Sequence, residues 1–132
     1  MIEVLIVDDS PEYCELLKTI LDHDPEIFPV GEANNGYDAL EFCEIFLPDI
    51  ILIDLMMPEC DGIKGTTIIK NKFPDVKIIV MTSIENECNL QKALEAGADG
   101  YFLKGIETPK LRKAIKNTVN GVTTIDKEIF IP

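Results

Sequence analysis

Acidic side chains, a hydroxyl and an ammonium group follow four of the apolar runs in this sequence. Asp8 and Asp9 come directly after the first run, and Asp54 follows a later one. Thr82 and Lys104 close two further runs. Carboxylates about 4 Å apart repel by roughly 1–4 kcal/mol, a cost that a divalent cation removes. Oxygen ligands without Cys or His favour Mg²⁺, which leaves coordination positions for phosphoryl oxygens. Together with an ammonium and a hydroxyl, such a site is suited to phosphoryl transfer.

Each of these residues also has an ordinary structural interpretation. Aspartates in turns commonly cap helices, a single lysine is usually a solvated charge, and threonine is a common turn residue. Their joint position at strand ends favours a functional site, because ligands bind beyond the carboxyl ends of parallel strands. One carboxylate must then accept the phosphoryl group. Asp54 is the best candidate, since it stands between the acid pair and the side that carries Thr82 and Lys104.

The elements that must position these residues are strands separated by helices. Five apolar runs predict strands, at residues 2–7, 27–30, 50–53, 76–81 and 101–103. Pro29 within the second run favours an edge or irregular strand. Runs that are apolar almost throughout, rather than alternating, are typical of a parallel sheet covered on both faces.

Amphipathic segments between these runs carry helix signals. Ser10 and Thr108 are expected N-cap residues, each followed by a proline at the first helical position. Turn residues up to Gly36 precede a second helix, a third is predicted over residues 63–73, and Gly97 ends a fourth. Strand and helix thus alternate five times, which predicts a single doubly wound α/β domain built from parallel βαβ units.

Length, charge and composition narrow the function classes. The 132 residues suffice for one domain, which we assign to residues 1–119, with residues 120–132 as a C-terminal tail or the start of a linker to an absent output domain. The net charge of −12 argues against binding of nucleic acid or of an anionic membrane by this segment. The apolar runs are shorter than the ~20 residues of a bilayer span and no signal peptide is apparent, so we expect a cytoplasmic protein.

Four motifs, in order, resemble the receiver domain of two-component response regulators, a member of the CheY-like superfamily. They are VDDS at residues 7–10, DLMMPECDG at 54–62, VMTS at 80–83 and AGADGYFLK at 96–104. The resemblance covers about residues 1–119. It implies a five-stranded flavodoxin-like sheet of order 2-1-3-4-5 with five helices, and an aspartate that takes phosphate from the phosphohistidine of a sensor histidine kinase. The domain is phosphorylated rather than turning over a substrate, so we do not expect an enzyme.

The resemblance also implies a metal site next to the acceptor. Asp54 is the implied phosphoacceptor, and Asp8 and Asp9 are implied to hold Mg²⁺, Asp9 more directly. Asp54 itself and the main-chain carbonyl of Met56 are the further implied ligands.

Signalling through this family implies a switch near the phosphoryl group. Thr82 is implied to bond a phosphoryl oxygen and Lys104 to pair with it, while Tyr101 occupies the switch-aromatic position and is expected to turn inward. A half-buried strand aromatic is the plain alternative for Tyr101. The face formed by the fourth helix, fifth strand and fifth helix, about residues 85–119, would then change its affinity for a partner. Phosphorylation is expected to promote homodimerisation or to release an output domain.

Lys104 is followed by Gly105 where many receivers have proline, which removes the usual route to a cis peptide bond. Receivers that resemble those of NarL/LuxR-type DNA-binding regulators often lack that proline. We therefore expect a receiver from a longer transcription regulator, whose missing domain would bind DNA. A stand-alone receiver in a phosphorelay is the alternative.

Residues next to the acceptor predict a long-lived phosphorylated state. Met56 and Ile84 lie two positions beyond Asp54 and Thr82, beside the expected path of an attacking water. Neither side chain can hydrogen-bond and orient that water, so autodephosphorylation is expected to be slow.

Two other classes of protein compete with this interpretation. A phosphatase of the haloacid dehalogenase type also forms an aspartyl phosphate with Mg²⁺, but its nucleophile belongs in a D-x-D pattern after the first strand, where this chain has Asp8-Asp9-Ser10. A pseudo-receiver that only binds partners usually lacks an acid or the lysine, and this chain keeps them all.

Overall fold

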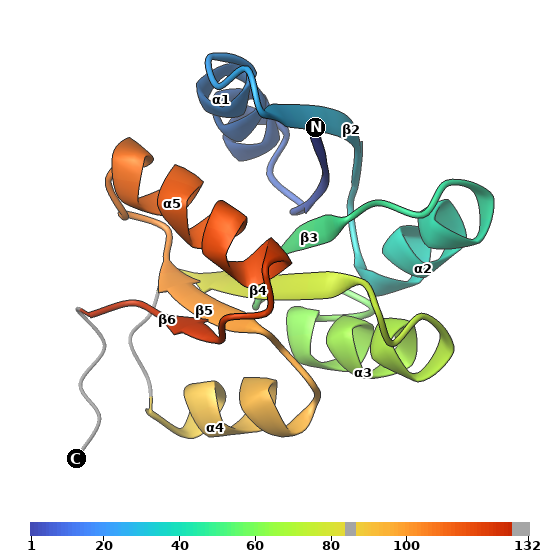
Figure 1. The fold of residues 1–132 in the computed structure, drawn as a ribbon. Helices are drawn as coiled ribbons and strands as arrows, with labels where there is room; N and C mark the ends of the chain where they lie inside the picture. The colour runs from blue at the N-terminus through green and yellow to red at the C-terminus, as the bar shows by residue number, and fades with distance from the viewer. Residues whose placement is uncertain (84–86, 128–132) are drawn as a thin grey trace.

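The computed structural model describes residues 1–83 and 87–127 and has a parallel sheet with helices on both sides (Figure 1). Strands and helices alternate along the chain, as the sequence pattern predicts. In order they are β1 (Ile2–Val7), α1 (Pro11–Asp22), β2 (Ile27–Ala33), α2 (Gly36–Ile45), β3 (Ile50–Asp54), α3 (Gly62–Lys72), β4 (Lys77–Thr82), α4 (Glu87–Glu95), β5 (Gly100–Leu103), α5 (Thr108–Val119) and β6 (Thr124–Ile125).

The sheet has six parallel strands in the order β2-β1-β3-β4-β5-β6. The predicted flavodoxin-like order of the first five strands is confirmed, but the expected count of five is wrong. Residues placed in a tail form β6, whose Thr124 pairs with Gly100 and whose Ile125 pairs with Tyr101. A strand of two residues is too short to give a recognisable apolar run in the sequence. It forms because β5 would otherwise present an unpaired edge, and the Asp126 amide donates to the Tyr101 carbonyl at 2.9 Å.

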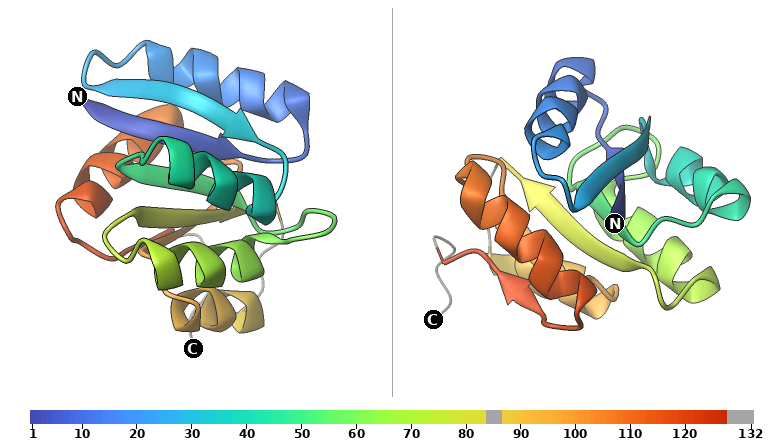
Figure 2. Two further views of the ribbon diagram at one scale, coloured as in Figure 1. Left: turned by 90° about the vertical axis from the view of Figure 1, so that its right-hand side faces the viewer. Right: turned by 45° about the horizontal axis from the view of Figure 1, so that its top comes forward.

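Two layers of helices bury the two faces of the sheet (Figure 2). On one face α1 and α5 pack against the sheet, and on the other α2, α3 and α4 do so. The side chains of β3 point alternately into the two layers, and all five of its residues are buried. A strand buried on both faces explains why its sequence is apolar without alternation.

The helix starts agree only partly with the sequence signals. Ser10 caps α1 as predicted, since its hydroxyl accepts a hydrogen bond from the Tyr13 amide at 3.2 Å. Thr108 is not a cap: it is the first residue of α5, and Glu107 takes the cap position without a side-chain hydrogen bond. Proline is tolerated throughout the first helical turn, so Pro109 did not fix the start to a single residue.

The strand at the edge, β2, is longer than the sequence predicts. It continues to Ala33 because a register shift absorbs the proline: Val4 pairs with Pro29, but Leu5 pairs with Gly31. Pro29 therefore sits at an irregularity of an edge strand, as expected.

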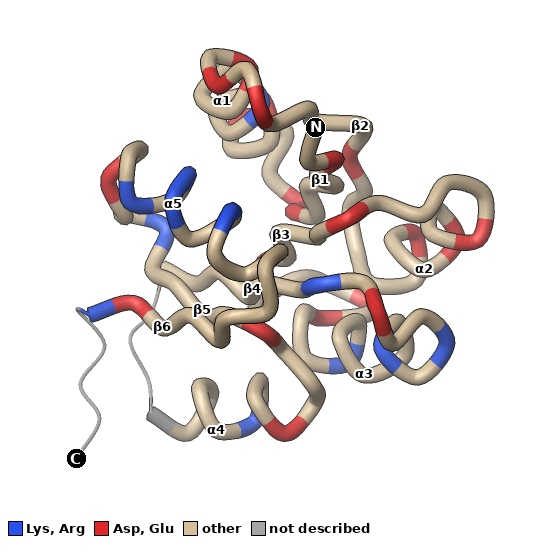
Figure 3. The backbone as a smooth tube through the Cα atoms, viewed as in Figure 1, with Lys and Arg blue, Asp and Glu red and all other residues tan. Residues whose placement is uncertain are grey.

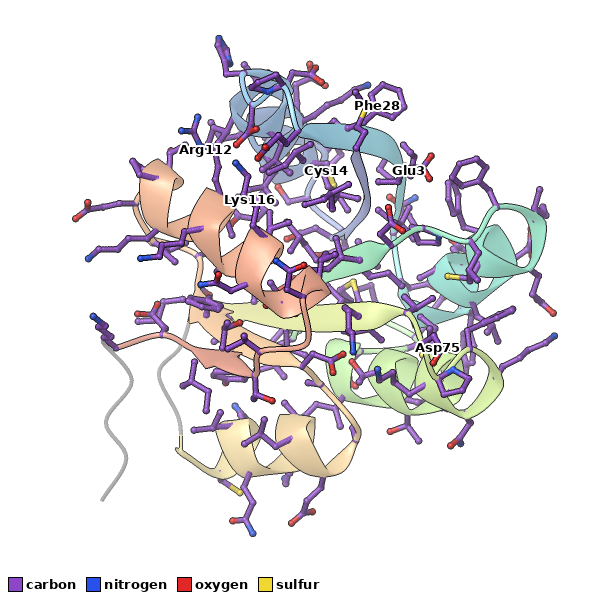
Figure 4. All side chains as sticks on the ribbon, viewed as in Figure 1. Glu3, Cys14, Phe28, Asp75, Arg112 and Lys116 are labelled. Carbon is purple, nitrogen blue, oxygen red and sulfur yellow. The ribbon has the colours of Figure 1, made fainter. Side chains whose placement is uncertain are left out.

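Ion pairs join α5 to the turn between α1 and β2. Basic residues gather along α5 although the chain as a whole is acidic (Figure 3). Lys116 and Arg112 extend from α5 toward α1 (Figure 4) and meet the buried Asp24 at 3.0 and 3.5 Å, and Lys116 also reaches Glu26 at 2.6 Å. Among the described helices, none is long and apolar enough to cross a membrane.

Candidate functional site

The first strand ends in an acid that is almost completely buried. Asp8 is 2% exposed, and its backbone amide continues the sheet by donating to the Ala33 carbonyl at 3.0 Å. Its carboxylate accepts the amide of Ser10 at 2.9 Å, which holds the side chain at the turn into α1. Asp9, the next residue, is exposed. The acid pair therefore presents one fixed, buried carboxylate and one that faces solvent.

Asp54 ends the central strand β3 and is also buried, at 7% exposure. The chain after it turns tightly: the Leu55 amide donates to the Met81 carbonyl at 2.8 Å, and the Gly62 amide donates to the Leu55 carbonyl at 2.9 Å. Burial, and then the neighbouring Asp8 charge, raise the pKa of Asp54. Lys104 and the backbone amide of Met56 act in the opposite direction. Two buried carboxylates side by side thus carry an electrostatic cost that one lysine offsets only in part.

Lys104 joins the ends of three strands. Its Nζ lies 2.6 Å from Asp8 Oδ2 and 3.3 Å from Asp54 Oδ1, and its backbone amide donates to the Thr82 carbonyl at 2.8 Å. Burial alone would lower the pKa of Lys104, but the hydrogen bond to Asp8 and the charges of Asp54 and Asp8 raise it. The ammonium is therefore held in its charged form against both acids.

The three acids form a group that can hold a metal ion. Asp8, Asp9 and Asp54 each offer a carboxylate oxygen, and these oxygens lie within 4.8 Å of one another. Three carboxylates and one ammonium leave a formal charge of −2, and the donors are all oxygen, which fits a hard divalent cation such as Mg²⁺. The residues present thus suit the metal implied by the sequence.

Three other residues named from the sequence lie on the same elements. Thr82 ends β4 and is 1% exposed, while the side chain of Met56 in the loop after Asp54 is 62% exposed. Tyr101 on β5 is completely buried rather than half-buried, and no described residue offers its hydroxyl a hydrogen-bond partner. Its role as a switch stays a prediction. Ile84, which we paired with Met56, lies outside the described residues.

The loop after β5 contains no cis peptide bond. All peptide bonds of the described residues are trans, including the one between Lys104 and Gly105. This agrees with the expectation from the missing proline.

One residue at the site was missed from the sequence. Tyr13, in the first turn of α1, lies with its ring centroid 4.4 Å from the Lys104 ammonium. The available signal was weak: Tyr13 is the single aromatic residue of the helix that follows the acid pair. Helical spacing alone assigns such a residue to the core, and the ring does also pack against the cluster under α1.

Comparisons with known proteins point to one family. A family model described as the response regulator receiver domain matches residues 4–116. The chemotaxis protein CheY of Halobacterium salinarum is 40% identical over 119 residues, which cover 90% of this chain and 98% of CheY. The transcriptional regulatory protein DegU of Brevibacillus brevis is 33% identical over 128 residues, covering 97% of this chain and 54% of DegU.

Solved structures agree with the sequence relatives. The crystal structure of a two-component response regulator of the LuxR family from an Aurantimonas species has a TM-score of 0.93 at 28% identity, and the match covers 98% of this chain and 92% of that one. The chain thus spans about half of the DegU relative and nearly all of the CheY relative.

Proposed function

The chain belongs to the response regulator receiver family, and on that premise we propose that Asp54 accepts a phosphoryl group from the phosphohistidine of a sensor histidine kinase. The observation that carries this proposal is the cluster around Lys104. Its ammonium bridges Asp8 and Asp54 at 2.6 and 3.3 Å, and Asp9 completes a group of acids within 4.8 Å. The family is described as a response regulator receiver domain, and DegU is a transcriptional regulatory protein.

In the proposed reaction each side chain has one task. A carboxylate oxygen of Asp54 attacks the phosphorus, and the bond between phosphorus and the donor imidazole nitrogen breaks, with its electron pair returning to the ring. Lys104 moves from Asp8 and Asp54 onto the oxygens of the transferred group, and the Thr82 hydroxyl donates to one of them. Mg²⁺ bound by Asp8, Asp9, Asp54 and the Met56 carbonyl would neutralise the negative charge that collects on these oxygens.

The backbone geometry supports a route for the switch. The Lys104 amide is hydrogen-bonded to the Thr82 carbonyl at 2.8 Å, so the ends of β4 and β5 are mechanically joined. We propose that drawing both side chains to the phosphoryl group repacks Tyr101 and shifts the face made by α4, β5 and α5, on which β6 covers the edge of β5. A homodimer through this face is the proposed result, and equal sedimentation with and without beryllofluoride would contradict it.

The proposed output is control of transcription by a domain beyond this chain. The match with DegU, a transcriptional regulatory protein, extends over 128 residues and covers 97% of this chain. In this proposal the receiver comprises residues 1–119 together with β6, the last strand of its sheet, and the residues after β6 lead toward a DNA-binding domain. A stand-alone receiver in a phosphorelay is supported by CheY, which this chain matches almost completely. In either case the kinase partner implies a cytoplasmic location.

Intact mass after incubation with acetyl phosphate and Mg²⁺ tests the acceptor. We expect the mass of one added HPO₃ in the wild type and none in Asp54→Asn. Asp75→Asn is the matched control, because Asp75 is an exposed acid just before the start of β4 (Figure 4), at the opposite end of the strand from the acceptor site. An adduct that persists in Asp54→Asn would refute the assignment. Continuous phosphate release from a monoester would favour a phosphatase, and no adduct at all a pseudo-receiver.

A further inference from the structure

The first turn of α1 places an aromatic ring against the lysine of the site. Ser10 begins the helix by accepting the amide of Tyr13 at 3.2 Å, so the cap fixes where this residue stands. The Tyr13 ring centroid lies 4.4 Å from Lys104 Nζ, within the range of a cation–π interaction. The ring and the two carboxylates thus contact the ammonium together.

We propose that Tyr13 is a positioning residue, whose ring holds the Lys104 ammonium at Asp8 and Asp54 in the place where it meets the incoming phosphoryl oxygens. This inference rests on the proposed function and adds a residue to it.

A lysine needs such support more than an arginine would. Its ammonium is a point charge on a flexible four-carbon stem, so one hydrogen bond to Asp8 and an ion pair with Asp54 do not by themselves fix its direction. The Lys104 side chain is 20% exposed, which shows that solvent has access to it. The negative face of the ring attracts the cation without forming a hydrogen bond that must break when the ammonium transfers to a phosphoryl oxygen.

The space beside the Tyr13 ring and the two carboxylates is dry. Tyr13, Asp8 and Asp54 close a narrow space over the core that leaves no room for a water molecule. Its floor is apolar and consists of Ile6, Val7, Leu17, Leu52 and Met81. The Asp8 and Asp54 carboxylates that attract the ammonium are therefore less screened on this side than they would be in water. Burial, and then the charges of Asp8 and Asp54, raise the pKa of Tyr13, so the phenol stays neutral.

Packing alone is the rival explanation, because Tyr13 also covers the core cluster under α1. Two substitutions separate the roles. Tyr13→Phe keeps the aromatic face, whereas Tyr13→Leu keeps apolar contact with the core but removes that face. If the ring only packs, both variants should be phosphorylated at similar rates. If it positions Lys104, the phenylalanine variant should keep at least half of the wild-type rate and the leucine variant should lose more.

The rate constant of phosphorylation by acetyl phosphate, at saturating Mg²⁺, is the first measurement. For Tyr13→Leu we expect a fall of about threefold to tenfold, which corresponds to about 0.7–1.4 kcal/mol. Urea unfolding of both variants shows that they are folded. Equal rates for the leucine and phenylalanine variants would overturn the inference.

A magnetic resonance measurement tests the placement without any phosphorylation. In protein with isotope-labelled lysine, the ring current of Tyr13 should shift the Lys104 ε-protons upfield in the wild type and in Tyr13→Phe. The shift should be lost in Tyr13→Leu, and Lys104→Met identifies the signal. A signal that is unchanged in Tyr13→Leu would overturn the inference while leaving Asp54 as acceptor. Wild-type protein that takes no phosphoryl group would instead overturn the proposed function, and with it this role of Tyr13.

Discussion

Replacement of Gly62 by alanine tests how the chain is packed behind the acceptor. A Cβ atom at Gly62 would lie 2.3 Å from the Asp54 carbonyl oxygen and 2.9 Å from the Leu55 Cα. Both contacts are with backbone, which cannot rotate away as a side chain would. Ordinary contacts begin at 3.4 Å, so the start of α3 and the end of β3 must separate by about 1 Å.

The magnitude follows from two opposing effects. Overpacking of a filled interior costs about 1–3 kcal/mol, whereas alanine is preferred over glycine within a helix by about 0.5–1 kcal/mol. Gly62 does not have a positive φ, so backbone strain adds nothing further. We expect Gly62→Ala to lower the free energy of unfolding by about 1–2 kcal/mol.

The same displacement should also slow the phosphorylation of Asp54. The Asp54 carboxylate accepts a hydrogen bond from the Met56 amide, in the loop that the hydrogen bond from Gly62 to Leu55 closes. A misplacement of about 1 Å near reacting groups can cost up to a hundredfold in rate, so we expect phosphorylation by acetyl phosphate to slow by at least about tenfold.

Urea unfolding and the phosphorylation rate are measured together, with Gly105→Ala as the matched control. No atom of the described residues lies within 4 Å of a Cβ at Gly105, and its φ is not positive, so this variant should unfold within about 0.5 kcal/mol of the wild type. If Gly62→Ala matched the control in both stability and rate, the close packing behind Asp54 would not be what positions the acceptor.

Three further predictions concern Asp24, Asp126 and Met56. Hydrogen bonds from the Glu26 amide and the Lys116 ammonium lower the pKa of Asp24 in the folded protein. The ionised Asp24 carboxylate therefore stabilises the fold above pH ~4, and this stabilisation is lost as the pH falls further. Asp24→Asn should therefore lower the free energy of unfolding by about 1–3 kcal/mol at pH 7. The difference in unfolding free energy between variant and wild type should shrink as the pH is lowered, and a difference independent of pH would contradict this. The Asp126 carboxylate accepts the Leu103 amide at 3.0 Å, so Asp126→Ala should speed hydrogen exchange at that amide by about tenfold or more, and unchanged exchange would show that β6 is held without it. Met56→Asn should shorten the lifetime of the phosphorylated protein about tenfold, as followed by loss of the adduct mass, and an unchanged decay would refute the role of this position.

Local patterns in the sequence were sufficient for most of the fold. Apolar runs fixed the five main strands because each must be buried, and caps such as Ser10 marked where a helix begins. Residues at the ends of these runs, such as Asp54, were located for the same reason: parallel strands bring their carboxyl ends to one edge of the sheet. Local signals could not place Thr108, because proline is compatible with several positions in a first turn.

Only the tertiary structure decided which residues that are distant in sequence come into contact. The ion pair of Lys104 with Asp8 joins residues 96 positions apart, and no spacing rule selects Asp8 over Asp54 as the nearer partner. The ring of Tyr13 meets that lysine only because α1 and the loop after β5 converge over the same strand ends. Likewise β6 forms because β5 offers it an open edge, not because two residues favour a strand. The tendency of a residue to be buried can be read from its own type, whereas its contact partners depend on how the whole chain packs.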